Sequence, residues 1–279
     1  MNQYTTHIKA KNSWFDINLK ELVQYRDLIF LFVKRTYTTM YKQTILGPLW
    51  LVFNPILTVS LYALVFGRVA QLSTDGAPQF AFYLCSNAIW SFFATCITDT
   101  SKTFSSNAAI MGKVYFPRLV MPISAVITAL INMMIQLGIL LVVMVFYYVS
   151  GVGISVSFSI LLVPIIILQT GLLGLGCGII VASLTTKYRD LAVLVSFGVQ
   201  LWMYASPVVY TFSQIPKKYV GIYLLNPMAP ILTMWRNAIL GTKGIEIVYW
   251  CISWVITVVI LIIGIILFSH IEKNFMDTV

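Results

Sequence analysis

The stretch LVMPISAVITALINMMIQLGILLVVMVFYYV (Leu119–Val149) decides the fold, because its 31 residues include no charged side chain. An α-helix crosses the roughly 30 Å hydrocarbon core of a bilayer with about 20 predominantly apolar residues. This stretch is too long for a perpendicular crossing, so we expect it to tilt or to begin as an interfacial segment near Pro122. It therefore predicts a membrane-spanning helix.

Five further apolar runs approach or exceed the length of a spanning helix. They are Leu49–Val69, Phe80–Ile97, Phe158–Leu184, Leu191–Tyr210 and Val248–Phe268. The chain of 279 residues is 59% hydrophobic and 10% charged, whereas a soluble domain carries roughly 25% charged residues. We predict an all-α integral membrane protein with six transmembrane helices in a single transmembrane domain, residues 1–279.

Lysines and arginines gather on one side of this topology. Of the 18 in the chain, 13 precede the first span, follow the last, or lie between spans two and three or four and five. The positive-inside rule then places both termini in the cytoplasm. The net charge of +9 is thus explained by topology, and no nucleic-acid partner is expected. The connection between spans five and six, with four basic residues on the other side, runs against the trend.

Two regions outside the spans are predicted to lie at the membrane surfaces. Residues 1–47 form a cytoplasmic segment and 48–279 the six-span core. Within the first segment, Leu19–Tyr37 is predicted to be an interfacial helix, because its apolar block is short and its flanks are charged. Asn18 and Glu21 have the spacing of a helix start. Between spans five and six, short apolar pieces separated by prolines predict two re-entrant half-helices at the outer face, Tyr219–Leu225 and Ile231–Leu240.

No group for energy conversion or catalysis stands out inside the predicted spans. None of the nine acidic residues lies in the middle of a span, and neither histidine does. Ion-coupled transporters commonly place such groups there, so ion coupling is disfavoured. The chain has no G-x-x-x-x-G-K-[ST] phosphate loop. Without a nucleophile–base constellation or metal-ligand spacing, we predict no catalytic residue, no metal site and no cofactor in this chain.

Small and polar residues within the spans are predicted to join helices. Gly174, Gly178 and Ala182 recur at four-residue spacing, which lets two helices approach closely. Asn132 and Gln136 lie on one face of the third span. We interpret them as interhelical hydrogen-bonding residues, the alternative being that they line a polar pathway.

Aromatic side chains are abundant, and several lie deep in the predicted spans. Many of the 17 Phe, 15 Tyr and 7 Trp are expected in interfacial belts or in ordinary packing. Aromatic faces can also stack on the C–H face of sugars. The candidates for lining a glycan path are Phe53, Tyr62, Phe66, Tyr83, Trp90, Trp202 and Tyr204.

The run YKQTILGPLW (Tyr41–Trp50) resembles the entry to the first span of ABC transporter permeases that export bacterial surface polysaccharides. Further matches follow in the same order over nearly the whole chain. They are Phe66–Arg68 (FGR), Lys113–Arg118 (KVYFPR), Tyr188–Asp190 (YRD), Ser206–Tyr210 (SPVVY), and Asn226-Pro227 followed by Arg236. The runs Tyr41–Trp50 and Lys113–Arg118 are fairly specific, and the collinear order supports the shorter motifs.

The resemblance implies a homodimer in the bacterial inner membrane, bound to two copies of a separate ABC ATPase subunit that holds ATP and Mg. It implies export of O-antigen, capsule or teichoic acid on a polyprenyl-diphosphate or other lipid carrier, with O-antigen our first choice. It assigns Ser101, Lys102 and Phe104 to ATPase coupling, and Asn226, Pro227, Trp235 and Arg236 to an outer gate. Four basic residues at the inner edge are candidates to meet the lipid diphosphate, the alternative being plain positive-inside anchoring: Arg35, Lys42, Lys113 and Arg118.

Three other functions remain open on the residues alone. An ABC permease for a small molecule or drug would share the fold. A membrane enzyme acting on polyprenyl-linked sugars would need a carboxylate constellation, which is missing from the spans. A secondary transporter would need ion coupling, which is disfavoured as above.

Overall fold

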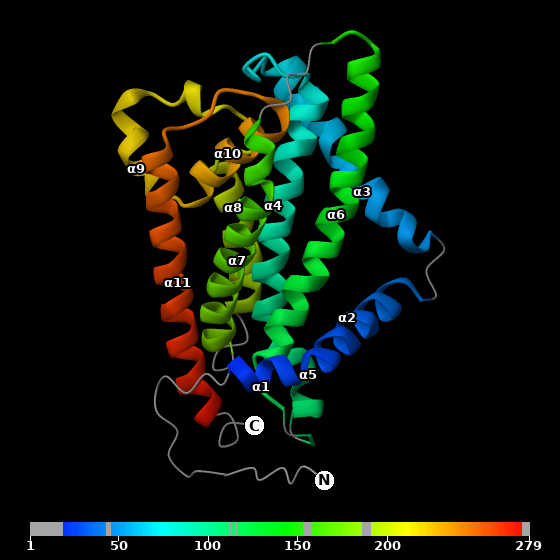
Figure 1. Cartoon of the computed structure of the whole chain (residues 1–279), viewed down its shortest axis with the longest axis vertical. Helices are drawn as coiled ribbons and strands as arrows, with labels where there is room; N and C mark the ends of the chain where they lie inside the picture. Colours follow the sequence, from blue (N-terminus) through cyan, green and yellow to red (C-terminus); the bar gives the residue numbers. More distant parts are fainter. Residues whose placement is uncertain are drawn as a thin grey trace.

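The computed structural model describes residues 19–42, 46–111, 113–114, 116–152, 158–185 and 191–274, and the regular structure in these ranges is helical throughout (Figure 1). The all-α prediction is confirmed for them. The long helices are α3 (Trp50–Tyr62, continued by the π-helix η2, Ala63–Val69), α4 (Gln79–Ser101), α6 (Val120–Val149), α7 (Val163–Thr185), α8 (Leu191–Tyr204) and α11 (Ile247–Asn274). The shorter ones are α1 (Leu19–Gln24), α2 (Arg26–Tyr41), α5 (Thr103–Met111), α9 (Val220–Leu224), α10 (Met228–Leu240), η1 (Gly47–Leu49), η3 (Phe158–Leu162), η4 (Phe212–Gln214) and η5 (Lys217–Tyr219).

Five segments are long and apolar enough to cross a membrane, and they agree with five of the six predicted spans. They are Gly47–Val69, Gln79–Ser101, Val120–Val149, Ser159–Thr185 and Ile247–Ser269. The remaining prediction, a span over 191–210, extends too far. The apolar helix there ends at Tyr204, and the chain then turns, with Ser206 N donating to Met203 O. Pro207 explains the end, because proline disfavours helical backbone at the residue before it.

Helix α4 forms the centre of the bundle and packs extensively against α6 and α7 (Figure 1). Its side chains are buried over most of its length, yet its mean hydropathy of 1.5 is the lowest of the five spans, whereas Ile247–Ser269 reaches 3.0. A helix that faces lipid needs an apolar surface, but an inner helix can carry polar side chains that bond to neighbouring helices. The lower hydropathy of α4 therefore agrees with its central position.

Glycines bring α7 close to two neighbouring helices, as the sequence predicts for Gly174 and Gly178. A Cβ atom at Gly174 would lie 2.6 Å from Cys96 Cβ, and one at Gly178 would lie 2.6 Å from Thr100 Cβ, both on α4. On another face of α7, a Cβ at Gly176 would lie 2.9 Å from Leu261 Cα on α11. Close backbone approach of this kind replaces the hydrophobic driving force that lipid cannot supply between spanning helices.

The polar residues of α6 form interhelical hydrogen bonds, which confirms that interpretation of Asn132 and Gln136. Gln136 Nε2 donates to Ser91 Oγ at 3.0 Å, and Asn87 Nδ2 donates to Gln136 Oε1 at 3.3 Å. Tyr37 Oη on α2 donates to Asn132 Oδ1 at 2.6 Å. Both side chains thus fix neighbouring helices to α6.

The lower end of the bundle is crossed by α2, which lies against α6 at a steep angle to it (Figure 1). The predicted helix over 19–37 is present as two helices, α1 and α2, and it continues to Tyr41. Ile29, Phe32 and Val33 are buried on one face of α2, while Phe30 and Leu31 are exposed. The predicted helix-start residue Asn18 and the motif at 188–190 lie outside the described residues.

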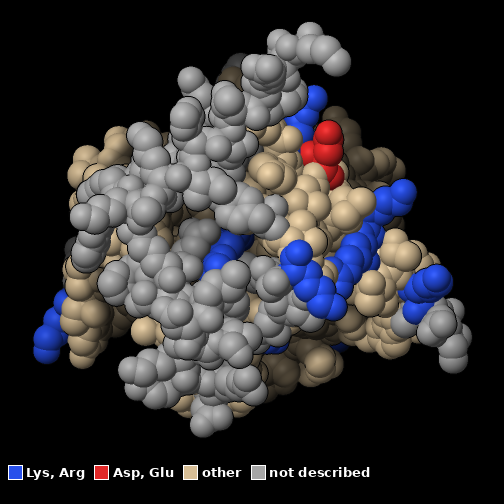
Figure 2. All heavy atoms as spheres, turned by 90° about the horizontal axis from the view of Figure 1, so that it is seen from below, with Lys and Arg blue, Asp and Glu red and all other residues tan. Residues whose placement is uncertain are grey.

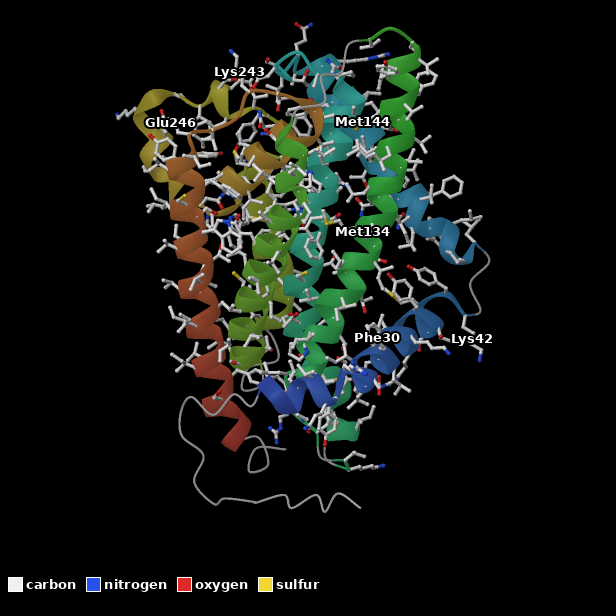
Figure 3. The ribbon with its side chains drawn as sticks, viewed as in Figure 1. Phe30, Lys42, Met134, Met144, Lys243 and Glu246 are labelled. Atoms are coloured by element: carbon white, nitrogen blue, oxygen red, sulfur yellow. The ribbon has the colours of Figure 1, made fainter. Side chains whose placement is uncertain are left out.

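The upper end holds α9 and α10, together with Lys243 and Glu246 (Figure 3). Lys42 and Phe30 are at the other end of the molecule in the same view. Helix α10 is buried along nearly its whole length, and it packs against α4, α7 and α11. Gly241 ends it with a left-handed backbone, φ 65°, a conformation that glycine adopts readily. The two short helices predicted between spans five and six are therefore present.

Candidate functional site

Asn226 connects the start of α10 to α8 and to the turn that follows α8. Its Oδ1 accepts from Trp202 Nε1 at 3.0 Å and from Met228 N at 3.1 Å. Its Nδ2 donates to Ala205 O at 3.1 Å and to Ser206 Oγ at 2.9 Å. The amide therefore uses both its acceptor and its donors, which explains why an asparagine suits this position.

Further bonds hold α10 and its start to α4 and α11, and α11 to α7. Trp235 Nε1 donates to Cys85 O on α4 at 2.9 Å, and Ser253 Oγ on α11 donates to Pro227 O at 2.8 Å. Gln169 on α7 donates to Ser253 Oγ at 2.9 Å and accepts from Trp250 Nε1 at 2.7 Å. The predicted gate residues Asn226, Pro227 and Trp235 thus each take part in a hydrogen bond between α10 or its start and a different neighbouring helix.

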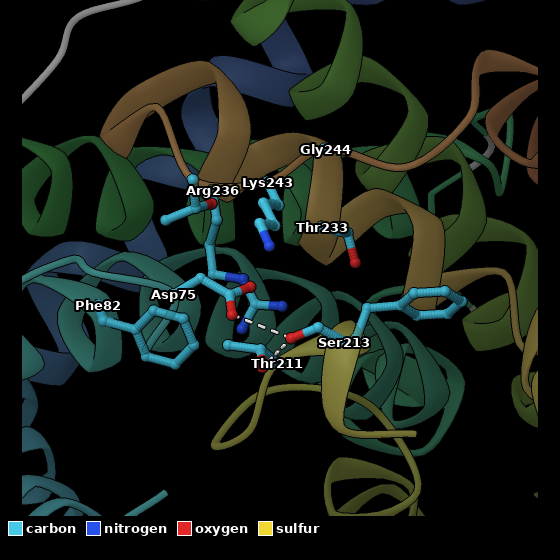
Figure 4. Close-up of a pocket in the computed structure, with 10 residues that line it drawn as sticks. Asp75, Phe82, Thr211, Ser213, Thr233, Arg236, Lys243 and Gly244 are labelled. Carbon is cyan, nitrogen blue, oxygen red and sulfur yellow. Dashed lines mark hydrogen bonds between the residues drawn. The ribbon is translucent and has the colours of Figure 1, made fainter. Parts of the chain in front are cut away.

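Arg236, the fourth predicted gate residue, lines a separate cavity of about 130 Å³ (Figure 4). Its side chain is only 2% exposed. Nη1 donates to Tyr210 O at 3.1 Å, and the guanidinium carbon lies 4.6 Å from the centre of the Phe82 ring. Burial lowers the pKa of Arg236 to about 10, so the guanidinium stays positively charged at neutral pH.

Besides Phe82 of α4 and Thr233 of α10, three segments that the sequence does not single out contribute to the cavity wall. Asp75 lies before α4, Ser213 in η4, and Lys243 after α10. Ser213 Oγ donates to Asp75 Oδ1 at 2.9 Å. No local motif could reveal this grouping, because its members are up to 168 positions apart, from Asp75 to Lys243. Only the fold brings them together.

The predicted basic residues lie toward the lower end, where Lys and Arg side chains gather on the described part of the surface (Figure 2). Arg35 and Lys42 are exposed on and just after α2, Lys113 is exposed after α5, and Arg118 is half-buried before α6. Two of the four thus come from α2 and its end, and two come from the connection between α5 and α6. The described side chains at this end offer an anion a positively charged surface.

Of the three residues assigned to ATPase coupling, only Lys102 is exposed. Ser101 and Phe104 are buried, at 2% and 4% exposure. Phe104 packs on Phe268 of α11 with ring centres 5.1 Å apart, and Thr185 Oγ1 of α7 donates to Ser101 O at 3.1 Å. Phe104 thus packs α5 against α11, and Ser101 joins the end of α4 to α7, so a partner subunit could reach Lys102 but not these two side chains in this conformation.

The aromatic candidates divide into buried and exposed groups. Tyr83 and Trp90 are buried, whereas Phe53 and Tyr204 are 46% and 54% exposed. Tyr62 contacts both Phe66 and Tyr83 with ring centres 5.9 and 6.4 Å apart. Phe93 packs against both Trp90 and Trp202. The structure therefore forms two aromatic clusters rather than one continuous row.

A further group of aromatic side chains, at the upper end, was not predicted from the sequence to form a common surface. Tyr210, Tyr219 and Tyr223 line a wide cavity of about 520 Å³ at the upper end, together with Leu72, Gln214, Ile215 and Pro216. The hydroxyls of Tyr210 and Tyr223 are hydrogen-bonded to each other. Tyr210 and Tyr219 stand beside the prolines and short helices of an irregular segment, so helical spacing gives no indication that they share a surface.

Comparison with known proteins agrees with this architecture. The family model described as ABC-2 type transporter matches residues 27–240, from the first turn of α2 to the end of α10. An O-antigen export system permease protein, RfbA, of Klebsiella pneumoniae is 29% identical over 253 residues, which cover 90% of this chain and 94% of the relative. The protein of the same name from Myxococcus xanthus is 30% identical over 221 residues, covering 78% of this chain and 82% of the relative. These matches confirm the resemblance, and the chain belongs to the ABC-2 type transporter family.

Proposed function

We propose that this chain is the permease subunit of an ATP-driven exporter that moves lipid-linked O-antigen polysaccharide from the cytoplasmic side across the bacterial inner membrane. The observation that carries the proposal is the near full-length similarity to permeases named for O-antigen export. Family membership makes the chain a transport subunit and not an enzyme. Such a permease works with an ATP-binding partner subunit, and we assign ATP and Mg to two copies of it.

The lower end of the bundle is the cytoplasmic end in this proposal. Exposed basic residues lie there in α2 and in the connection between α4 and α6, as the positive-inside rule requires. Helix α2 would then lie in the cytoplasmic interface, with Phe30 and Leu31 in the acyl boundary. Both chain termini would be cytoplasmic, with α8 crossing as the sixth transmembrane segment and α9 and α10 re-entering from the outer face.

We assign the pairing of two copies into a homodimer to the exposed apolar side chains on α3 and α8. Large hydrophobic residues on α3 include Phe53, Leu57 and Leu61, and those on α8 include Phe197 and Leu201. Lipid and a second copy are both suitable neighbours for such surfaces. We place the polymer path between the two copies, where Phe53 and Tyr204 are already exposed to stack on sugars.

The two ends of the helix bundle then have different roles. The cytoplasmic end meets the lipid carrier and the ATPase subunit, and the outer end meets the sugars. At the cytoplasmic end, Arg35, Lys42, Lys113 and Arg118 would attract the diphosphate of the lipid carrier. Lys102 would contact the ATPase, with α5 as the coupling helix. At the outer end, the Tyr210, Tyr219 and Tyr223 surface would receive sugars that leave the path, and α10 would form the gate.

Deletion of the gene in its host tests the proposal. Surface O-antigen should be lost, and polymer on its lipid carrier should accumulate inside the cell. Expression of the wild-type gene should restore the surface polymer. Normal surface polysaccharide without intracellular accumulation would contradict the proposal. Accumulation of a different polymer, such as capsule, would retain the transport reaction and correct the substrate.

A further inference from the structure

The cavity around Arg236 contains more positive than negative charge. Arg236 and Lys243 supply two cations, and Asp75 supplies one carboxylate. Figure 4 shows Arg236, Lys243 and Asp75 around the same space. Among the described residues, no ion pair joins Asp75 to either cation. Arg236 is buried, whereas Lys243 is exposed and Asp75 is partly buried. Because a buried charge without a paired counter-ion is costly, the guanidinium of Arg236 favours an additional negative group.

The donors around this space are incompletely used. The guanidinium group has five N–H donors, and within the described chain its hydrogen bond is the one from Nη1 to Tyr210 O. Lys243 is exposed at the mouth of this space, and no ion pair joins its ammonium group to a described residue. The hydroxyl groups of Thr211 and Ser213 also line the cavity, but their donors are used, because Ser213 donates to Asp75 and is itself hydrogen-bonded to Thr211. The free donors are therefore those of the guanidinium and ammonium groups, and a flat guanidinium fork beside an ammonium group matches the oxygens of a phosphate-like anion.

The cavity is also large enough for such an ion. A single water needs roughly 10–15 Å³ of the same kind of space, and the cavity measures about 130 Å³. We propose that Arg236 and Lys243, in the pocket that Thr211 and Ser213 also line, bind a phosphate-type oxyanion at the upper end of the permease. Asp75 is the competing internal anion, because its carboxylate faces the same cations and is held by Ser213.

The chemistry of this site does not depend on which polymer the permease exports. Only its assignment to the outer membrane face rests on the proposed orientation. Two sources could supply the same oxyanion, namely free inorganic phosphate and the headgroup of an anionic phospholipid. In either case the bound anion neutralises Arg236 and joins the end of α10 to the segment that follows α8.

The test uses the purified full chain and inorganic phosphate, with chloride at equal ionic strength as the reference. The thermal midpoint is measured against phosphate concentration. The wild type should be stabilised by phosphate more than by chloride. Lys243→Gln should bind phosphate about 10-fold more weakly, because a charge-assisted hydrogen bond is lost. Lys218→Gln is the matched control, since Lys218 is also exposed at the upper end but does not line this pocket.

Asp75→Asn provides a variant with the opposite expected sign. Removal of the competing carboxylate should tighten phosphate binding several-fold. Asparagine tolerates the left-handed backbone at this position, φ 52°, and its amide oxygen can still accept from Ser213. If phosphate does not stabilise the wild type, either the site does not exist, which overturns the proposal, or lipid already occupies it. Nanodiscs of defined lipid composition separate these two cases. Equal phosphate affinity in the wild type, Lys243→Gln and Asp75→Asn would also overturn the proposal.

Nanodiscs distinguish the two sources. In phosphatidylcholine nanodiscs the wild type should respond to phosphate in either case. Loss of this response in phosphatidylglycerol nanodiscs identifies the lipid headgroup as the occupant, and persistence identifies the free anion. No response in either lipid refutes the site. Because these assays measure binding and not export, a negative result leaves the export proposal to its own genetic test.

Discussion

Replacement of Gly264 by alanine should force α11 away from α7. A Cβ atom at Gly264 would lie 2.8 Å from Gly176 O, whereas ordinary van der Waals contact begins at 3.4 Å. The obstacle is backbone, so no side-chain rotation relieves it. The two helices must therefore separate locally by the difference of 0.6 Å. A gap of about 0.5–1 Å removes about a quarter to a half of the dispersion attraction between facing atoms.

The expected free-energy change combines two effects. Overpacking of a well-packed interface costs about 1–3 kcal/mol, while alanine favours the helix over glycine by about 1 kcal/mol. Gly138→Ala on α6 isolates the second effect, because a Cβ there has no neighbour within 4 Å. The free energy of unfolding of Gly264→Ala should therefore be lower than that of Gly138→Ala by about 1–3 kcal/mol.

The assay is equilibrium unfolding of the detergent-solubilised chain by titration with SDS. Wild type, Gly264→Ala and Gly138→Ala are compared in the same detergent. Gly198→Ala on α8, where a Cβ is also unobstructed, provides a second control. If Gly264→Ala unfolds at the same SDS fraction as both controls, backbone contact between α7 and α11 does not limit the packing, and the reasoning is wrong.

Three further changes test other contacts. Gln169→Leu should lower the free energy of unfolding by about 1–3 kcal/mol, because the buried Trp250 N–H loses its acceptor. Gln200→Leu is the control, since Gln200 lies on the exposed surface of α8, and it should change the free energy of unfolding by less than about 0.5 kcal/mol. Asn226→Ala should speed amide hydrogen exchange over residues 205–228, because four hydrogen bonds are lost. Exchange within α6 should stay unchanged. Equal protection of 205–228 in the mutant and the wild type would contradict the assigned hydrogen bonds. In the complex with the ATPase subunit, Lys102→Glu should reduce ATP hydrolysis coupled to transport several-fold, whereas an unchanged rate would remove Lys102 from the docking surface.

Much of the helical framework could be predicted because the bilayer imposes a strong length requirement on apolar runs. Five spans agree with the sequence to within a few residues at each end. The small-residue spacing of Gly174 and Gly178 also predicted close packing, although it did not identify α4 as the partner. The extent of α8 was misjudged because apolar residues continue past Tyr204, while the turn is set by Pro207.

The upper-end site was only partly predictable. Arg236 and Asn226 could be singled out by their place in a resembling motif, but their contacts lie far away in sequence. Phe82 and Asp75 reach Arg236 from the start of α4 and the loop before it. Likewise, Ser101 and Phe104 lie where α4 ends and α5 begins, in a stretch that mixes polar and apolar residues. Only their packing against α7 and α11 shows that they are buried. Pairing of this kind is a property of tertiary structure, which local patterns do not encode.

The bonds around α10 constrain how the upper end could open. Movement of α10 alone would break the Trp235 bond to α4, the Asn226 bonds to α8, and the Ser253 bond from α11 to Pro227. Each hydrogen bond contributes about 0.5–1.5 kcal/mol net, and a broken pair that meets hydrocarbon instead of water costs more. Movement of α8 together with the start of α10 would keep the Trp202–Asn226 pair. Opening therefore costs least when these two elements move as one unit and the buried helix α4 stays in place.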